Sequence, residues 1–456
     1  MRTKSHVYLK GIVVMLVFSI ATCLNYSCKS QVENRYITYD GQAKSDTYQV
    51  TVNNDSVFVA KESFYGNKTF HTTQFAADTE TVVRITSKDP INSFKIKPAY
   101  LNIKAVVKEN ELVFTLNKPE KLFIEINDYK PLCLFSTPTE QGIPDPNDLD
   151  VLYFKKGVHN VGVLRPKNNQ TIYLEQGAIV KGRVYGENVK NITIKGRGII
   201  DARGFTSKKD KICGLEFKNS DHIKIEGIGL RTGIWWQSLF LLCNDVDISH
   251  MNLMSFGENN DGIDIDGVTN FKVTNSFIGC GDDGFGWHAL DAEANGEPDT
   301  ANCIAENCVI YNAYAGNGIR LGASMETKLF KNITFKNIAV LDHVNAAIRS
   351  DHSDWAVFKN VKFENFYIEK PSRPIEIRIE KTGYSNNTGF KNERGHFDGL
   401  HFENIHANGG KIILEGYDET HLIENVSFTN CYNKDVKLKS TNDITINDFV
   451  RNISFK

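Results

Sequence analysis

The sequence predicts an all-β chain in which a small antiparallel β-sandwich precedes a right-handed parallel β-helix. Short alternating runs separated by turn residues occupy residues 31–145. From residue 151 to residue 456, a single strand pattern recurs instead. The 28 Phe and 17 Tyr of this 456-residue chain, with only 11 Pro, favour strands and exclude collagen-like or proline-rich chains.

Charge and composition exclude two broad classes of protein. The 53 Lys and Arg nearly balance the 55 Asp and Glu, so the formal net charge is −2. A protein that binds nucleic acid through its phosphates needs a basic surface, which this balance does not provide. With 41% hydrophobic and 24% charged residues, the chain has the composition of a folded protein and not of a disordered one.

Residues 1–28 have the pattern of a signal peptide. Arg2, Lys4 and Lys10 precede an apolar run over residues 11–24, which is too short for a comfortable membrane span. We therefore expect export to the periplasm or the cell surface. Cys28 is a candidate lipid-attachment site of an outer-membrane lipoprotein. Ordinary signal-peptide composition is the alternative explanation for this cysteine.

The other cysteines are expected to be buried hydrophobic residues. Seven of the nine follow Cys28, and their spacing matches no zinc pattern. Most lie in or beside apolar runs, where a free cysteine packs as a small apolar side chain. A disulfide between Cys303 and Cys308 remains an alternative.

The sandwich is predicted from short runs at roughly ten-residue intervals. Examples are residues 48–52, 57–60, 82–86 and 112–116. Pro138, Pro144 and Pro146 then predict a linker before the second domain.

The repeat after residue 150 reads Asn-apolar-x-apolar-x-Asn/Gly. Clear copies are residues 191–196, 222–227, 245–250, 270–275, 332–337, 360–365, 399–404 and 425–430. With a degenerate copy that ends at Asn307, successive copies end 23–39 residues apart, and no helical segment is long enough for a crossover. Such strands can stack as about ten coils around an apolar interior. The closing Asn or Gly suits a tight bend, and stacked Asn can form side-chain ladders. A β-propeller is the main alternative, but it needs four strands per blade.

Acidic residues cluster at two successive coils. Residues 259–267 contain Asp261, and residues 279–288 contain Asp282 and Asp283. Asp261 and Asp282 are 21 residues apart, close to one coil, so stacking should bring the three carboxylates together. Neighbouring carboxylates raise one another's pKa, which equips them for acid and base catalysis at a glycosidic bond. Calcium binding and plain turn formation are the alternatives, and we expect neither a metal nor a cofactor.

These motifs resemble the polygalacturonase family of glycoside hydrolases, family 28. The resemblance rests on Asn259-x-Asp261-Gly-Ile-Asp, Gly281-Asp282-Asp283, and two weaker segments at residues 316–322 and 347–351. It implies a β-helix that hydrolyses α-linked galacturonans with inversion. It also implies Asp282 as the general acid, and Asp261 with Asp283 as the base that activates water.

Two positions depart from the family pattern. Asn317 stands where the family has His, and Asp351 where it has a Lys that faces a substrate carboxylate. Arg349 is kept, and Arg320 is an additional cation. A sandwich ahead of a β-helix, joined by segments such as residues 151–159 and 170–177, is similar to the dextranase and isopullulanase family, family 49. That family implies a neutral α-glucan as substrate.

The candidate substrate contacts are Asn259, His288, Asn317, Arg320, Arg349, Trp236 and Trp287. Aromatic faces stack on pyranose rings, although core packing is an equal alternative for the tryptophans. Trp355 and Tyr384 are weaker candidates. We expect the alternating charges of residues 373–380 to form a solvated face.

The resulting hypothesis is an exported inverting glycoside hydrolase that acts on an α-linked polysaccharide. The substrate would be a pectin-type galacturonan or a related plant or algal glycan. Acid and base would lie about 6.5–9.5 Å apart, with water between them. A polysaccharide lyase on the same fold and a non-catalytic glycan-binding protein are the alternatives.

Overall fold

The computed structural model describes residues 42–383 and 393–456. The predicted signal peptide, Cys28 and Tyr384 lie outside these ranges. None of the helices within them has the length and apolar character needed to cross a membrane.

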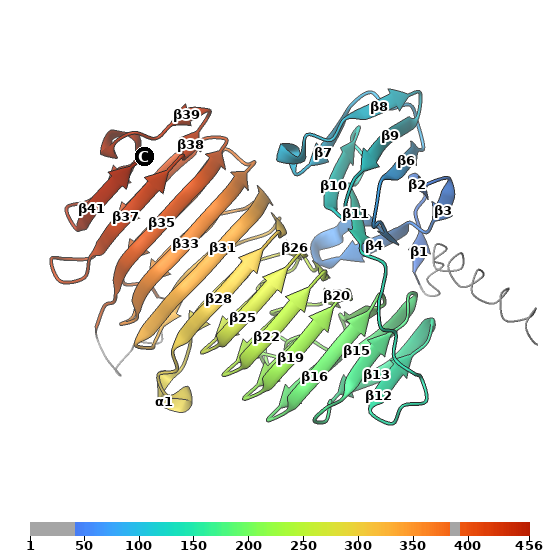
Figure 1. Cartoon of the computed structure of the whole chain (residues 1–456), viewed down its shortest axis with the longest axis horizontal. Coiled ribbons are helices and arrows are strands. Elements are labelled where there is room, and N and C mark those ends of the chain that lie inside the picture. Colours follow the sequence, from blue (N-terminus) through green and yellow to red (C-terminus); the bar gives the residue numbers. More distant parts are fainter. Residues whose placement is uncertain (1–41, 384–392) are drawn as a thin grey trace, which may run out of the picture.

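Two small sheets form the N-terminal sandwich (Figure 1). One sheet contains, in order, β1 (Ala43–Lys44), β4 (Ala60–Phe64), β5 (Lys68–Ala76), β11 (Leu132–Thr137), β10 (Lys121–Ile126) and β7 (Phe94–Lys97). The other contains β3 (Asp55–Val57), β2 (Tyr48–Val52), β6 (Thr81–Ser87), β9 (Glu111–Leu116) and β8 (Ala105–Lys108). The pairing is antiparallel as predicted, except that β5 and β11 run parallel. Val50, Ile85 and Leu122 belong to the apolar core between the sheets.

The remaining chain is a parallel β-helix of 30 strands, as predicted (Figure 1). The face built from the repeats contains β12 (Val151–Phe154), β14 (Thr171–Leu174), β16 (Lys190–Gly196), β19 (Asp221–Glu226), β22 (Asn244–Ser249), β25 (Thr269–Thr274), β28 (Thr300–Glu306), β31 (Leu329–Asp342), β33 (Val357–Ile368), β35 (His396–Ala407), β37 (Ile423–Thr429) and β41 (Val450–Phe455). A second face contains β13 (Gly157–Leu164), β15 (Ala178–Glu187), β17 (Ile199–Ala202), β20 (Gly229–Thr232), β23 (Asn252–Met254), β26 (Phe277–Cys280) and β29 (Val309–Asn312), and it continues through the second halves of β31, β33 and β35 to β38 (Tyr432–Asn433).

The third face carries the acidic motifs. It contains β18 (Leu215–Lys218), β21 (Ser238–Leu241), β24 (Ile263–Asp266), β27 (Phe285–Ala289), β30 (Ile319–Met325), β32 (Ile348–His352), β34 (Ser372–Ile379), β36 (Gly410–Glu415) and β40 (Thr445–Ile446). Short elements complete the described chain: η2 (Tyr65–Asn67), η3 (Ala99–Leu101), α1 (Ala292–Asn295), η4 (Thr441–Asp443) and β39 (Val436–Lys437), which pairs antiparallel with β38.

The repeated Asn residues take the conformation that the pattern predicts. Asn337, Asn365, Asn404 and Asn430 have φ between +53° and +56°, the left-handed region that Asn tolerates. Their side chains form a ladder, in which each Nδ2 donates to the Oδ1 of the preceding coil at 2.7–2.9 Å. The ladder satisfies polar groups at every bend and aligns one coil on the next.

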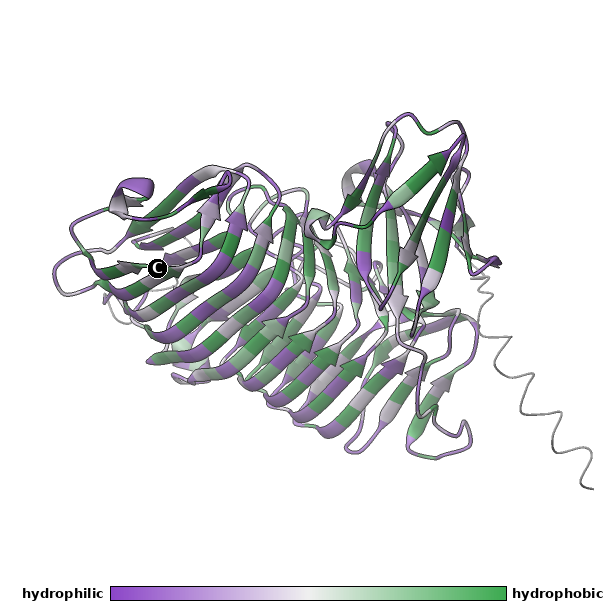
Figure 2. Ribbon diagram, turned by 45° about the horizontal axis from the view of Figure 1, so that its top comes forward, coloured by the Kyte–Doolittle hydropathy of each residue, from purple (hydrophilic) through white to green (hydrophobic). Residues whose placement is uncertain are grey.

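Hydrophobic and hydrophilic residues alternate along the strands of the β-helix (Figure 2). The hydrophobic side chains fill the interior column. Phe335, Phe363, Phe402 and Phe428 stack from coil to coil with ring centroids 4.9–5.3 Å apart. In the described part of the chain, the seven cysteines from Cys133 onward are buried and free, so the alternative disulfide between Cys303 and Cys308 does not form.

The sandwich packs against the β-helix through an aromatic cluster and a buried ion pair. Phe70 of β5 stacks on Phe256 of the β-helix at 4.4 Å. Beside it, Glu62 of β4 accepts hydrogen bonds from Arg231 of β20 at 2.8 and 3.1 Å. This junction places the β4–β5 hairpin over the coils that precede and include the acidic motifs.

Candidate active site

The structure brings Asp261, Asp282 and Asp283 together. One carboxylate oxygen from each lies within 4.8 Å of the others. Asp261 precedes β24 and Asp283 precedes β27, and these strands pair in parallel with Ile263 opposite Phe285. Residues that are one coil apart in the sequence therefore lie next to each other in space.

Asn260 holds the two acidic loops in place. Its side chain accepts the Gly257 N–H at 2.5 Å and donates to the Trp235 carbonyl at 2.6 Å. The backbone carbonyl oxygen of Asn260 accepts hydrogen bonds from the N–H of Gly281 at 3.1 Å and from the N–H of Asp282 at 3.3 Å. Gly281 is required there, because a Cβ would lie 2.0 Å from the Gly257 carbonyl oxygen. Asn259, the predicted contact, is half-buried beside this scaffold.

Asp283 is buried but surrounded by donors. It accepts the backbone N–H of Asn317 at 2.8 Å and its side-chain Nδ2 at 2.7 Å, and Arg320 Nη1 lies 3.4 Å away. Burial raises the pKa of Asp283, and Arg320 and Asn317 oppose that rise. Asn317 is only 2% exposed, so its side chain lies behind Asp283 and orients that carboxylate.

Asp282 is the most exposed of the three carboxylates. Burial and the neighbouring Asp283 raise the pKa of Asp282 to about 7, against the opposing effect of Arg320. Burial and the charges of the nearby aspartates raise the pKa of Asp261 well above its ordinary value. Asp261 Oδ1 has no hydrogen-bond partner among the described residues. Asp282 is therefore the most accessible carboxyl of the three and has a raised pKa, whereas Arg320 and Asn317 partly offset the raised pKa of the buried Asp283.

A fourth carboxylate, Asp264, belongs to the same cluster, and the sequence reasoning gave it no role. It is fully buried, and its Oδ1 lies 3.3 Å from His288 Nε2. Burial raises the pKa of Asp264 and lowers the pKa of His288 to about 4. Trp236 stacks on His288 with centroids 5.6 Å apart. The strand period could have found Asp264, because it alternates with the inward Ile263 and Ile265.

Trp287 is not a substrate contact, which corrects the prediction. Its side chain is fully buried in the interior column, 4.4 Å from the ring of Phe335. It pairs in register with Ile265 and Leu321, which also point inward, whereas His288 points outward. Trp355, a weaker candidate, is buried as well, with 7% of its surface exposed. Its Nε1 donates a hydrogen bond to Glu297 at 2.7 Å.

The two candidate arginines are paired with acidic side chains. Arg320 donates to both oxygens of Asp351, at 2.9 and 2.6 Å. Arg349 lies 3.1 Å from Glu376 and 3.6 Å from Glu380. Glu376 is 4% exposed, so the charges of residues 373–380 form partly buried ion pairs and not the expected solvated face.

The cluster contains side chains that could bind a metal ion, but protonation of the carboxyls explains their close approach equally well. Asp261, Asp264 and His288 offer atoms within 4.8 Å of one another, as do the three predicted carboxylates. The raised pKa of each carboxyl means that bound protons can relieve the repulsion.

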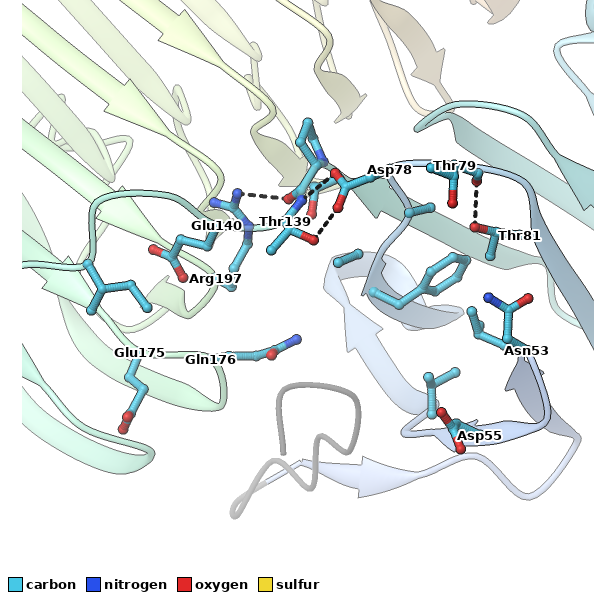
Figure 3. Close-up of a pocket in the computed structure, with 18 of the residues that line it drawn as sticks. Asn53, Asp55, Asp78, Thr79, Thr81, Thr139, Glu140, Glu175, Gln176 and Arg197 are labelled. Atoms are coloured by element: carbon cyan, nitrogen blue, oxygen red, sulfur yellow. Dashed lines mark hydrogen bonds between the residues drawn. The ribbon is translucent and has the colours of Figure 1, made fainter. Parts of the chain in front are cut away.

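A separate cavity of about 380 Å³ lies where the sandwich meets the first coils (Figure 3). Glu140 and Arg197 line it, together with Asp78, which accepts the Thr139 N–H at 2.8 Å. None of the clustered carboxylates lines this cavity. We therefore assign the chemistry to the acidic cluster, where several buried carboxylates converge.

A β-helix that carries this cluster on neighbouring coils belongs to the class of β-helical glycoside hydrolases. Residues 143–416 match Glycosyl hydrolases family 28, and the chain belongs to that family. Its substrate class is accordingly a polysaccharide or an oligosaccharide.

Three solved structures are similar to this chain, and the first of them supports the fold. Dex49A from Penicillium minioluteum is 14% identical with a TM-score of 0.60, and the match covers 92% of this chain and 96% of that one. The polygalacturonase from Erwinia carotovora ssp. carotovora is 16% identical with a TM-score of 0.49, covering 66% and 86%. The family 28 exopolygalacturonase from Yersinia enterocolitica is 14% identical with a TM-score of 0.42, covering 82% and 96%. No curated protein matches the sequence.

Proposed function

We propose that the chain hydrolyses an α-linked glycosidic bond of a polysaccharide with inversion. The candidate substrates are pectin-type galacturonan, related plant or algal glycans and neutral α-glucans, and the charges at the site help to choose among them. The observation that carries the proposal is the contrast between two adjacent carboxyls. Asp282 is partly exposed with a pKa of about 7, and Asp283 is buried among donors that favour its ionised form.

The proposed step divides acid and base work between these groups. Asp282 donates its proton to the glycosidic oxygen as the bond to the anomeric carbon breaks. Asp283, with Asp261, takes a proton from the water that attacks the anomeric carbon from the opposite face. Asn317 and Arg320 hold Asp283 in position as the charge moves.

The carboxylate spacing is shorter than the sequence-based expectation. The nearest oxygens of the three residues lie within 4.8 Å, whereas acid and base in inverting enzymes are separated by about 6.5–9.5 Å between carboxyl groups. Distance alone therefore does not select inversion over retention. The anomer released first, followed by proton NMR, decides it: the inverted anomer supports the proposal and the retained anomer overturns that part of it.

Within this substrate range, we infer that the sugar at the reacting bond is uncharged. Arg320 is held by Asp351 and Asp283, and Arg349 by Glu376 and Glu380. The clustered carboxylates add further negative potential. A uronate in this groove would meet like charges, which costs several kcal/mol unless a cation compensates. A lyase needs such a cation for the same carboxylate, so these ion pairs also disfavour the lyase alternative.

A matched pair of polymers tests both statements. We expect kcat/KM on carboxyl-reduced polygalacturonan, dextran or pullulan to exceed that on polygalacturonan by at least about tenfold. Reducing-end release is the measurement, and ultraviolet-absorbing unsaturated products would indicate a lyase. Cleavage of polygalacturonan but not of its carboxyl-reduced form contradicts the charge inference. No release from any polymer contradicts hydrolysis itself.

The pH profile should have its alkaline limit near the pKa of Asp282. Because the acid must be protonated, kcat/KM should fall about tenfold per pH unit above about pH 7. Arg320→Met removes a cation that lowers this pKa, so the alkaline limb should move to higher pH. A profile measured on both proteins with one cleaved polymer checks the sign, and a limb that moves to lower pH contradicts the assignment.

Export to the periplasm or the cell surface, with Cys28 as the lipid-attachment site, is also part of the proposal. The charged start and the short apolar run of residues 1–28 support it.

A further inference from the structure

Two exposed tyrosines from different domains lie beside the acidic cluster. Tyr65 belongs to η2 of the sandwich, and Tyr314 follows β29 of the β-helix. They are 48% and 45% exposed, and their rings meet edge to face with centroids 6.4 Å apart. The mechanism above uses neither of them.

Tyr65 is fixed against the loop that precedes Asp261. A Cβ on Gly257 would lie 3.3 Å from Tyr65 Cβ and Cγ, so the tyrosine packs directly on that glycine. Gly257 is in turn hydrogen-bonded to Asn260, the residue that organises the acidic loops. Lys68, at the start of β5, donates to the Ala313 carbonyl at 2.8 Å and ties the hairpin to the β-helix.

The loop that carries Tyr314 is fixed against the segment that carries Asp282. The neighbours of Tyr314, Ala313 and Ala315, donate to the carbonyls of Cys280 at 3.3 Å and Gly281 at 2.7 Å. A Cβ on Gly316, whose φ is +70°, would lie 2.2 Å from Asp282 Oδ1. The loop that carries Tyr314 therefore runs in contact with the proposed general acid.

This arrangement has the chemistry of a sugar-binding surface. Tyrosine offers an apolar ring face for the C–H groups of a pyranose and a hydroxyl for its polar edge. Each tyrosine is anchored by the backbone around it, so little conformational entropy is lost when a ligand binds. The exposed pair borders the catalytic groups, where a glycan chain must pass.

We propose that Tyr65 and Tyr314 form a pyranose-binding subsite on the leaving-group side of the scissile bond, and that the sandwich domain thereby supplies part of the substrate groove. The side follows from the contact of the Tyr314 loop with Asp282, so the proposal rests on the proposed function, in which Asp282 protonates the leaving group. The ligand is the sugar ring that departs with the glycosidic oxygen.

The test uses Tyr65→Ala, Tyr314→Ala and the double variant in the full chain. On a polymer that the wild type cleaves, we expect each single change to lower kcat/KM about tenfold, mainly through KM, and the double change to lower it more. Tyr65→Phe should restore most of the binding that Tyr65→Ala loses, because it keeps the ring. Tyr417→Ala, at another tyrosine that is 43% exposed, is the matched control.

A binding measurement separates the subsite from the chemistry. Asp282→Asn protein, with and without the two alanine changes, is run through gels that contain dextran or carboxyl-reduced polygalacturonan. Weaker retention of the alanine variants supports the subsite. Unchanged retention and unchanged kcat/KM overturn it while leaving the proposed function intact. If the wild type releases no reducing ends from any polymer, the proposed function fails, and the leaving-group assignment fails with it.

Discussion

Asp282→Asn is expected to lower kcat by about a thousandfold or more while the protein stays folded. General acid catalysis contributes about 10²–10⁴ in rate, and an amide cannot supply the proton. Asp282 is the partly exposed carboxyl whose pKa is raised to about 7, so it is the group best able to carry that proton at neutral pH. Reducing-end release on a cleaved polymer gives the rate, and circular dichroism gives the fold.

The neighbouring variants sharpen this test. Asp283→Asn and Asp261→Asn should be similarly inactive, because the base must be ionised and both residues lie in the same cluster. Asp245→Asn is the matched control, since Asp245 begins a strand on the repeat face and its side chain is 55% exposed. If Asp282→Asn keeps most of the activity, Asp282 is not the acid.

Glu62→Ala should lower the free energy of unfolding by about 3–5 kcal/mol, the largest expected effect outside the cluster. Glu62 and Arg231 have side chains only 3% exposed, and they join the sandwich to the β-helix at 2.8 Å. Removal of the carboxylate leaves the Arg231 guanidinium buried without its counter-charge. Thr72 Oγ1, which donates to Glu62 at 2.6 Å, loses its acceptor as well.

Chemical denaturation followed by tryptophan fluorescence measures this change. Asp46→Ala is the matched control, because its ion pair with Lys61 is largely exposed and should contribute little to stability. A loss below about 1 kcal/mol for Glu62→Ala would mean that the junction does not depend on the buried pair. The same variant should also weaken the proposed subsite, since Glu62 lies in the strand that leads to Tyr65.

Local patterns were sufficient where one coil contacts the next. The period-two strands and their closing Asn residues predicted the β-helix, because each coil repeats the same apolar face and the same left-handed bend. The interval of 21 residues predicted that Asp261 would lie beside Asp282 and Asp283. Residues that are one coil apart in the sequence lie on neighbouring strands of the sheet.

The incorrect site predictions concerned the side of the strand to which a side chain points. Trp287 and His288 were both predicted to contact substrate, yet they alternate, so Trp287 fills the interior and His288 points outward beside Asp264. The pairing of Trp287 with Ile265 and Leu321 determines which of the two side chains points inward. The sequence of one strand does not reveal this pairing. Asp264 was missed although its alternation with the inward Ile263 and Ile265 marks it as outward-facing.

Sequence patterns alone were therefore enough to predict the architecture, the family resemblance and the meeting of the three carboxylates. All of these depend on residues one coil apart or less. The packing of the sandwich on the β-helix, in contrast, pairs Glu62 with Arg231 and brings Tyr65 beside the acidic loops. Tyr65 and Gly257 are separated by most of the sandwich and several coils. Their contact depends on how two separately formed cores pack together, which no local spacing encodes.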